Sequence, residues 1–214
     1  MKVKSNLDEI LYDRIIERLI SGDYTMGQKL TLDELAKYFE VSRTPVVQAV
    51  KLLVNDGVLQ TMSNGRLYVP EYDRDTVRQM CEVRHLLEGC ALDVYLSGKG
   101  LPEDVVVPKL VYYAEQCRKL AGEAEYVAFA TVDRKFHRAL VEASGNDILV
   151  ETYNRVQGRF LVANYLIRPL CKRDFFGTSD GHEDILNAVR SRDAQRAQRC
   201  LRAHIEGVLQ TLSQ

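Results

Sequence analysis

The segment 41–50, VSRTPVVQAV, constrains the fold more than any other part of the chain. Its Ser, Arg and Thr residues stand at the start of an amphipathic helix, and a shorter helix is expected just before it, over 32–39. Two short helices joined by a tight turn form a helix-turn-helix, in which the first turn of the second helix contacts base edges and phosphates. The segment therefore predicts a DNA-binding domain.

The neighbouring residues complete a unit of three helices. Apolar residues recur at helical spacing over 7–21 and predict a first helix. Thr31 and Glu34 match a capping box at the start of the second helix. Thr44 and Pro45 begin the third helix, at a position where the missing N–H of proline costs nothing.

A small β-hairpin is expected after the third helix. Residues 58–62 and 66–69 have the pattern of short strands, and Ser-Asn-Gly at 63–65 is a turn signal. Residues 29–31 are expected to form only a connector. Three helices followed by a hairpin predict a winged helix-turn-helix.

The remainder of the chain is expected to be helical, because apolar residues keep helical spacing and no strand pattern occurs. The predicted helices cover residues 75–97, 103–121, 124–143, 147–168, 179–191 and 193–213, with a break at Pro169. Six such helices favour an antiparallel bundle. We expect a mainly α protein with a winged helix-turn-helix domain over 1–70, a linker over 71–76 and an all-α bundle over 77–214.

Composition excludes several classes of protein. Hydrophobic residues make up 46% of the chain and charged residues 28%, which is ordinary for a globular protein. No apolar window of about 18 residues and no secretory signal occur, so we expect no membrane partner. The five cysteines are scattered without a CxxC pair, which argues against a disulfide framework and favours a cytoplasmic location.

The net charge gives little support to strong non-specific binding of DNA. The net charge is −1, and the first 70 residues hold nine basic and nine acidic side chains. A local positive surface is still expected, because the third helix has Arg43 and Lys51 without acids between 41 and 55, and Arg66 follows in the hairpin. The predicted DNA-contacting residues are Ser42, Arg43, Thr44, Lys51 and Arg66.

Three of the four histidines are placed like metal ligands. Asp133 and His137 are one helical turn apart and share a face. His182 and His204 are equally far from a predicted turn at 192–194, so antiparallel helices would bring them level. One carboxylate and three imidazoles suit Zn²⁺, Ni²⁺, Mn²⁺ or Fe²⁺. The alternative is an exposed i,i+4 pair and two ordinary histidines.

Several short motifs are spread over nearly the whole chain. They are ISGDY at 20–24, LA at 35–36, VSRTPV at 41–46, VRHLLE at 83–88, DRKFH at 133–137, GN at 145–146, HEDIL at 182–186 and the closing His204. With these motifs the chain resembles GntR-family transcriptional regulators of the FadR-like branch, which carry a C-terminal helical FCD domain.

The resemblance implies a homodimer on a pseudo-palindromic operator in double-stranded DNA, with a C-terminal domain that senses a small organic acid. It also implies that Asp133 and the three histidines hold a divalent transition metal, Zn²⁺ first, beside which the acid binds. Arg84 matches a family position near the cavity, and Arg159 and Asn164 are further candidates for contacting the effector. The alternative for Arg84 is a surface ion pair with Glu88.

The chain departs from the family pattern at two places. Val47 stands where the family usually has Arg, and valine cannot make the bidentate guanine contact, worth about 1–3 kcal/mol of discrimination. The hairpin carries Asn-Gly-Arg at 64–66 where Asn-Arg-Gly is usual. The operator is therefore expected to differ from the common one, or specificity to be weaker.

The leading hypothesis is a ligand-responsive regulator, repressor or activator, and not an enzyme. A metal-dependent enzyme using the Asp-His₃ site is one alternative, because such sites with open positions also do chemistry. An interaction module that no longer binds DNA is another. Sequence-specific, salt-sensitive DNA binding separates the first hypothesis from the others, and turnover of a bound acid would favour the second.

Overall fold

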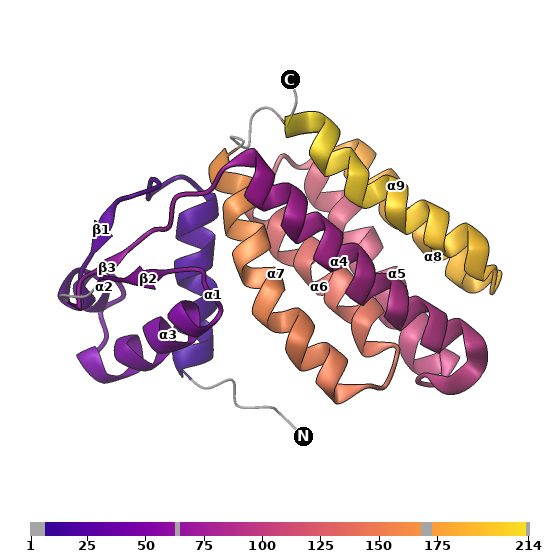
Figure 1. The fold of residues 1–214 in the computed structure, drawn as a ribbon, viewed down its shortest axis with the longest axis horizontal. Helices are drawn as coiled ribbons and strands as arrows, with labels where there is room; N and C mark the ends of the chain where they lie inside the picture. The colour runs from indigo at the N-terminus through magenta and orange to yellow at the C-terminus, as the bar shows by residue number, and fades with distance from the viewer. Residues whose placement is uncertain (1–6, 63–64, 168–172, 213–214) are drawn as a thin grey trace.

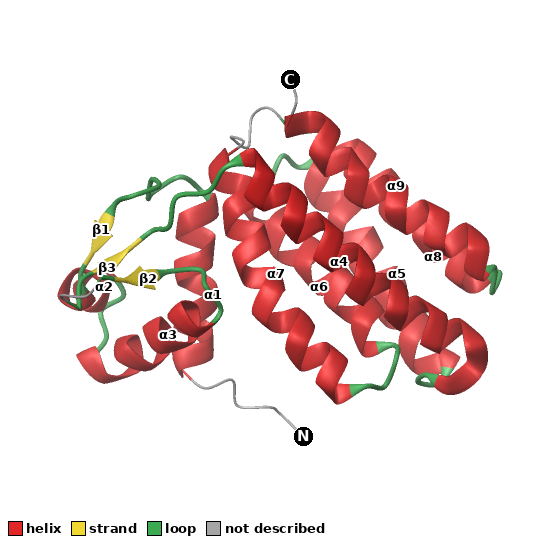
Figure 2. Cartoon of the chain, in the orientation of Figure 1, coloured by secondary structure: helices red, strands yellow, loops and turns green. Residues whose placement is uncertain are grey.

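The computed structural model describes residues 7–62, 65–167 and 173–212. Figure 1 shows a small sheet with a group of helices on one side and a larger group of helices on the other. Helices dominate the described part of the chain (Figure 2), as the sequence predicted. The expected hairpin turn at 63–64 and the expected break at Pro169 lie outside the described residues.

The N-terminal domain is a winged helix-turn-helix. Its helices are α1 (Leu7–Ile20), α2 (Leu32–Tyr38) and α3 (Arg43–Asn55). The predicted capping box is confirmed, because the Glu34 backbone N–H donates to Thr31 Oγ1 (3.2 Å) and the Thr31 N–H donates to the Glu34 carboxylate (3.0 Å). The box fixes where α2 begins and therefore the turn that leads into α3.

The small sheet of this domain contains one strand more than the sequence predicted. Its strands are β1 (Lys29–Leu30), β2 (Gln60–Thr61) and β3 (Leu67–Tyr68), in the antiparallel order β1-β3-β2. The expectation that residues 29–31 form only a connector was wrong, because Lys29 and Leu30 pair with β3. A strand of two residues is too short to show the alternation by which strands are recognised.

The C-terminal region is an all-helical bundle. Its α-helices are α4 (Arg74–Val94), α5 (Glu103–Gly122), α6 (Tyr126–Glu142), α7 (Asp147–Ile167), α8 (Phe175–Arg190) and α9 (Ala194–Leu212). A π-helical turn, η1 (Tyr95–Lys99), follows α4. Helix α8 begins four residues before the predicted start, because the Asp174 carboxylate accepts the backbone N–H of Gly177 and caps an extra turn.

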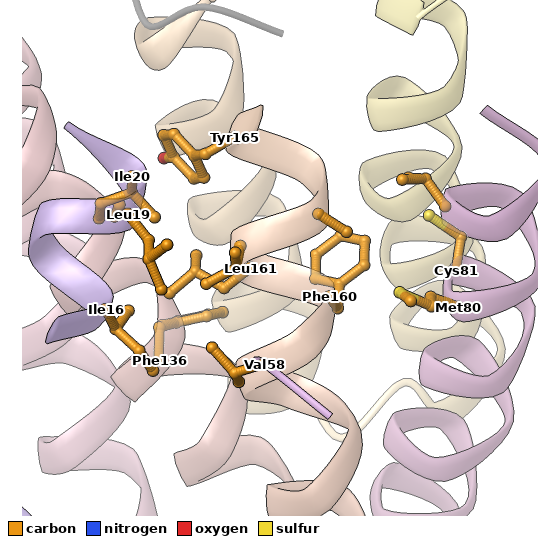
Figure 3. Close-up of a cluster of buried hydrophobic side chains, with 14 of the residues drawn as sticks. Ile16, Leu19, Ile20, Val58, Met80, Cys81, Phe136, Phe160, Leu161 and Tyr165 are labelled. Carbon is orange, nitrogen blue, oxygen red and sulfur yellow. The ribbon is translucent and has the colours of Figure 1, made fainter. Parts of the chain in front are cut away.

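The two regions share one apolar core. Ile16 of α1 and Val58 of the N-terminal domain belong to the same buried cluster as Phe136 of α6 and Leu161 of α7 (Figure 3). Helix α1 lies beside α7 in Figure 1. The winged helix-turn-helix domain is therefore packed directly against the bundle.

Polar contacts fix the same interface. Arg134 of α6 forms an ion pair with Asp13 of α1. Tyr72 is buried and its hydroxyl donates to the carbonyl of Gly57 (3.1 Å). The segment before α4 is thus held against the N-terminal domain. No helix in the described ranges is both long and apolar enough to cross a membrane.

Candidate functional site

Four side chains with metal-binding atoms meet inside the bundle. Asp133 and His137 lie one turn apart on α6, His182 comes from α8, and His204 comes from α9. One ligand atom of each lies within 4.8 Å of the other three. The structure therefore brings together all four residues that the sequence placed in a metal site.

The separations between these atoms suit a first-row divalent metal. The Nε2 atom of His137 lies 3.0 Å from Nε2 of His204 and 3.4 Å from Nε2 of His182. Oδ1 of Asp133 lies 3.0 Å from Nε2 of His182 and 3.7 Å from Nε2 of His137. Tetrahedral ligands bound at 2.0–2.1 Å are separated by about 3.3 Å, so the four residues fit a shared ion.

The turn between α8 and α9 makes this convergence possible. It falls where the sequence predicted it, with Arg192 in the left-handed region at φ 52° and α9 beginning at Ala194. Gly181 lets the two helices approach, because a Cβ built on it would lie 2.5 Å from Nδ1 of His204. The sequence analysis missed this glycine, since an isolated glycine within a helical pattern carries no sign of its neighbour.

Burial and neighbouring groups shift the pKa values of Asp133, His182 and His204. Burial alone would raise the pKa of Asp133, but the neighbouring imidazoles of His137 and His182 hold that pKa well below its ordinary value. Burial lowers the pKa of His182, and burial together with the other two imidazoles holds the pKa of His204 well below its usual value. An ionised carboxylate and neutral imidazoles are the forms that bind metals.

A second layer of polar side chains lies behind His137. Glu88 is fully buried, and its carboxylate accepts from Nε of Arg84 (2.8 Å) and lies 2.8 Å from Nδ1 of His137. Burial opposes its charge, yet Arg84 and His137 bring the pKa of Glu88 to about 2. The same carboxylate raises the pKa of His137 against the effect of burial. The ion pair expected at the surface thus exists, but it lies in the core.

A cavity of about 650 Å³ opens beside the cluster. Its walls include Asp133, His137, His204 and two of the predicted effector residues, Arg84 and Asn164. The sequence analysis missed further polar residues of the wall, which are Arg173, Thr178, Arg199 and the acidic residues Asp174, Asp180 and Asp184. The wall thus carries cationic, amide and carboxylate side chains beside the metal ligands, and its arginines and amide suit an anionic group.

Arg159 does not line this cavity, so its expected place in the effector site is corrected. Its side chain packs against Gly57, where a built Cβ would lie 3.1 Å from Cδ of Arg159, and its guanidinium lies 5.9 Å from the ring centre of Tyr72. Arg159 and Asn164 differ by five positions on α7, which turns their side chains to different faces.

All five predicted DNA-contacting residues are exposed. Ser42 precedes α3, Arg43 and Thr44 form its first turn, Lys51 lies two turns further along, and Arg66 is in the wing. Arg43 lies 3.5 Å from Asp33 in an exposed ion pair, which is weak and can be exchanged for a phosphate. Val47, one turn after Arg43, is partly buried, and its own turn of α3 contains no arginine.

Two family models match the chain. The FCD domain matches residues 79–207, and the model for bacterial regulatory proteins of the gntR family matches residues 7–69. The Uxu operon regulator of Haemophilus influenzae is 26% identical and covers 96% of this chain and 84% of its own length. The regulator LutR of Bacillus subtilis is 25% identical, over 90% of this chain and 95% of its own.

Solved structures have the same fold. McbR/YncC of Escherichia coli matches with a TM-score of 0.81 at 19% identity, covering 98% of both chains. A metal-free FCD domain of another regulator matches 66% of this chain and 94% of its own with a TM-score of 0.55, at 19% identity. The winged helix-turn-helix, the helical bundle and the two family matches together show that this chain belongs to the GntR family of bacterial transcriptional regulators, with a C-terminal FCD domain.

Proposed function

We propose that this protein is a DNA-binding transcriptional regulator whose operator affinity is controlled by a small carboxylate metabolite bound at a metal ion. The observation that carries the proposal is the convergence of Asp133, His137, His182 and His204 beside a cavity in the bundle. That bundle is packed directly against a winged helix-turn-helix. A ligand site and a DNA-binding domain thus belong to one packed unit.

The proposed ion is Zn²⁺ first, with Ni²⁺, Mn²⁺ and Fe²⁺ as alternatives, because one carboxylate and three imidazoles suit all four. When bound, the ion supplies a Lewis-acidic centre for a carboxylate oxygen. Arg84, Arg173 and Arg199 add positive charge to the cavity wall, and Asn164 adds an amide. The wall also contains Asp174, Asp180 and Asp184, so the proposal of an organic acid rests on the arginines, the amide and the metal ion.

The proposed DNA surface comprises the start of α3 and the wing. In this assignment the DNA-binding domain covers residues 1–70, a linker covers 71–76 and the effector domain covers 77–214. A homodimer would present two such surfaces to a pseudo-palindromic operator. The effector would shift the population of two arrangements of these surfaces, with a coupling free energy of about 1–3 kcal/mol.

Metal content tests the first half of the proposal. Wild-type protein reconstituted with Zn²⁺ and desalted should retain about one equivalent, whereas His182→Ala and His204→Ala should lose most of it, because each removes one of four ligands. His85→Ala is the matched control, since His85 is the histidine outside the cluster. Equal metal content in all four proteins would contradict the site.

Operator binding tests the second half. Fluorescence anisotropy with the DNA upstream of the protein's own coding region, across a salt series and against scrambled DNA, should show specific binding that weakens with salt. Carboxylic acids are then screened for release of the bound DNA by the metal-loaded protein. Binding that is indifferent to sequence at that DNA and at genomic fragments would contradict a regulatory function.

A further inference from the structure

Glu88 stands directly behind one of the proposed metal ligands. Its side chain is fully buried on α4, and its Oε2 atom lies 2.8 Å from Nδ1 of His137. Nε2 of the same ring points the other way, toward His182 and His204. The carboxylate therefore contacts the one nitrogen of His137 that a metal in the cluster does not use.

Glu88 is itself held in one orientation. Its Oε1 atom accepts from Nε of Arg84 (2.8 Å) and from the hydroxyl of Tyr153 (2.8 Å). Gln157 donates from Nε2 to the Tyr153 oxygen (3.2 Å) and to the carbonyl of Arg134 (2.6 Å). Arg84, Tyr153 and Gln157 are buried, so these bonds form away from water. A buried carboxylate with donors on both oxygens has little freedom to rotate.

The contact selects one tautomer of His137. A carboxylate only accepts hydrogen bonds, so Nδ1 of His137 carries the proton. In the neutral ring the lone pair then lies on Nε2, which faces the other ligand atoms. His182 lacks such support, because its buried Nδ1 has no hydrogen-bond partner among the described residues. Of these two buried rings, His137 is the one with a carboxylate behind it.

We propose that Glu88 is a positioning residue of the metal centre, which fixes the ring orientation and the tautomer of His137 and is itself held by Arg84 and Tyr153. The inference rests on the metal site proposed above and adds a residue outside the ligand set. Carboxylates behind metal-bound histidines orient the ring and increase its basicity, and their loss typically lowers metal affinity 10- to 100-fold.

A purely structural role for Glu88 predicts a different result. If the Arg84–Glu88 pair served only the packing of α4, its loss would lower the stability of the metal-free protein. The affinity of the folded protein for metal would then stay the same. Metal affinity and the spectrum of the bound ion therefore separate the two roles, whereas thermal stability does not.

The experiment uses the full chain with Glu88→Gln, which keeps the shape of the side chain and removes its charge. Zn²⁺ affinity is measured by competition with a chromophoric chelator, and the site is also loaded with Co²⁺ to record its visible absorption. We expect affinity to fall about 10- to 100-fold with an altered Co²⁺ spectrum. Glu142→Gln is the matched control, because Glu142 pairs with Lys109 and Arg138 at the surface.

Three outcomes would be decisive. Unchanged Zn²⁺ affinity and an unchanged Co²⁺ spectrum in Glu88→Gln would overturn the positioning role while leaving the metal site intact. A wild-type protein that binds neither ion would overturn both proposals. If circular dichroism shows that Glu88→Gln does not fold, Tyr153→Phe replaces it, because that change removes one donor to Glu88 and keeps the ion pair. Metal affinity should then fall several-fold, and an unchanged affinity would overturn the positioning role.

Discussion

At the scale of single residues, Arg43 and Val47 are the informative positions of the proposed DNA surface. Arg43 is exposed in the first turn of α3, beside the weak partner Asp33. Val47, one turn further along, has no polar group with which to contact a base edge. We therefore expect Arg43 to carry a larger share of recognition than it would beside an arginine at position 47.

Arg43→Ala should weaken operator binding about 5- to 150-fold, which corresponds to about 1–3 kcal/mol for a lost arginine contact to a base. If Arg43 instead contacts a phosphate, the slope of affinity against salt should decrease by about one. Anisotropy titrations across a salt series measure both. Arg202→Ala is the control for loss of a positive charge, because Arg202 is exposed and lies on α9 of the bundle, outside the proposed DNA surface. Operator affinity equal to that of Arg202→Ala would place Arg43 outside the DNA contact.

The individual site residues differ in how far the sequence could reveal them. Asp133 and His137 follow from helical spacing, and His182 and His204 from a correctly placed turn. Glu88 looked like an ordinary i,i+4 partner, because burial of an ion pair depends on the helices packed over it. Arg159 packs against Gly57 and does not line the cavity, and a helical position alone could not show which neighbour it contacts.

At the scale of elements, α1 connects the two regions through a close approach to α7. A Cβ built on Gly158 would lie 2.6 Å from the hydroxyl of Tyr12 and 3.2 Å from Cγ2 of Val58. The Tyr12 hydroxyl is not free to move, because it donates to Asp56 (2.8 Å). Gly158 therefore sets how closely the DNA-binding domain can approach the bundle.

Gly158→Ala should lower the free energy of unfolding by about 1–3 kcal/mol, as overpacking of a tight contact does. Urea denaturation followed by circular dichroism measures the loss. Gly122→Ala is the matched control, because no atom lies within 4 Å of a Cβ at that position. In a Tyr12→Phe background the same substitution should cost less, since the obstructing oxygen is gone. Equal costs in both backgrounds would exclude the Tyr12 hydroxyl as the obstacle.

Helix positions were largely predictable from apolar spacing, whereas ends and very short elements were not. The capping box at Thr31 marked one helix start correctly. The start of α8 was missed, because Asp174 caps a turn whose glycine and serine content resembles a loop. The pairing of β1 with β3 joins segments far apart in the sequence, and such pairing has no local signal.

At the scale of the whole molecule, the continuous core predicts that both regions unfold together. Ile16 is buried where α1 meets the bundle, so its contacts serve both sides. Ile16→Ala should lower stability by about 2–5 kcal/mol, and calorimetry should show one transition at a lower temperature. Hydrogen exchange should quicken in α3 and α7 alike.

Ile148→Ala is the control for this experiment, because Ile148 is 72% exposed and its truncation should change stability little. Two separate transitions in the wild-type protein would show that the shared core does not couple the regions. Faster exchange confined to α3 in the Ile16→Ala variant would lead to the same conclusion. Either result would also weaken the proposed route from the effector cavity to the DNA.

The shared core also limits how this protein could be recombined with its relatives. A chimera cut near residue 70 would place a foreign α1 against α6 and α7 of this chain, and its side chains would have to match Phe136 and Leu161. Arg134 would need an acidic partner at the position of Asp13. A working exchange of DNA specificity should therefore replace the exposed surface of α3 and the wing, and leave the buried face of α1 as it is.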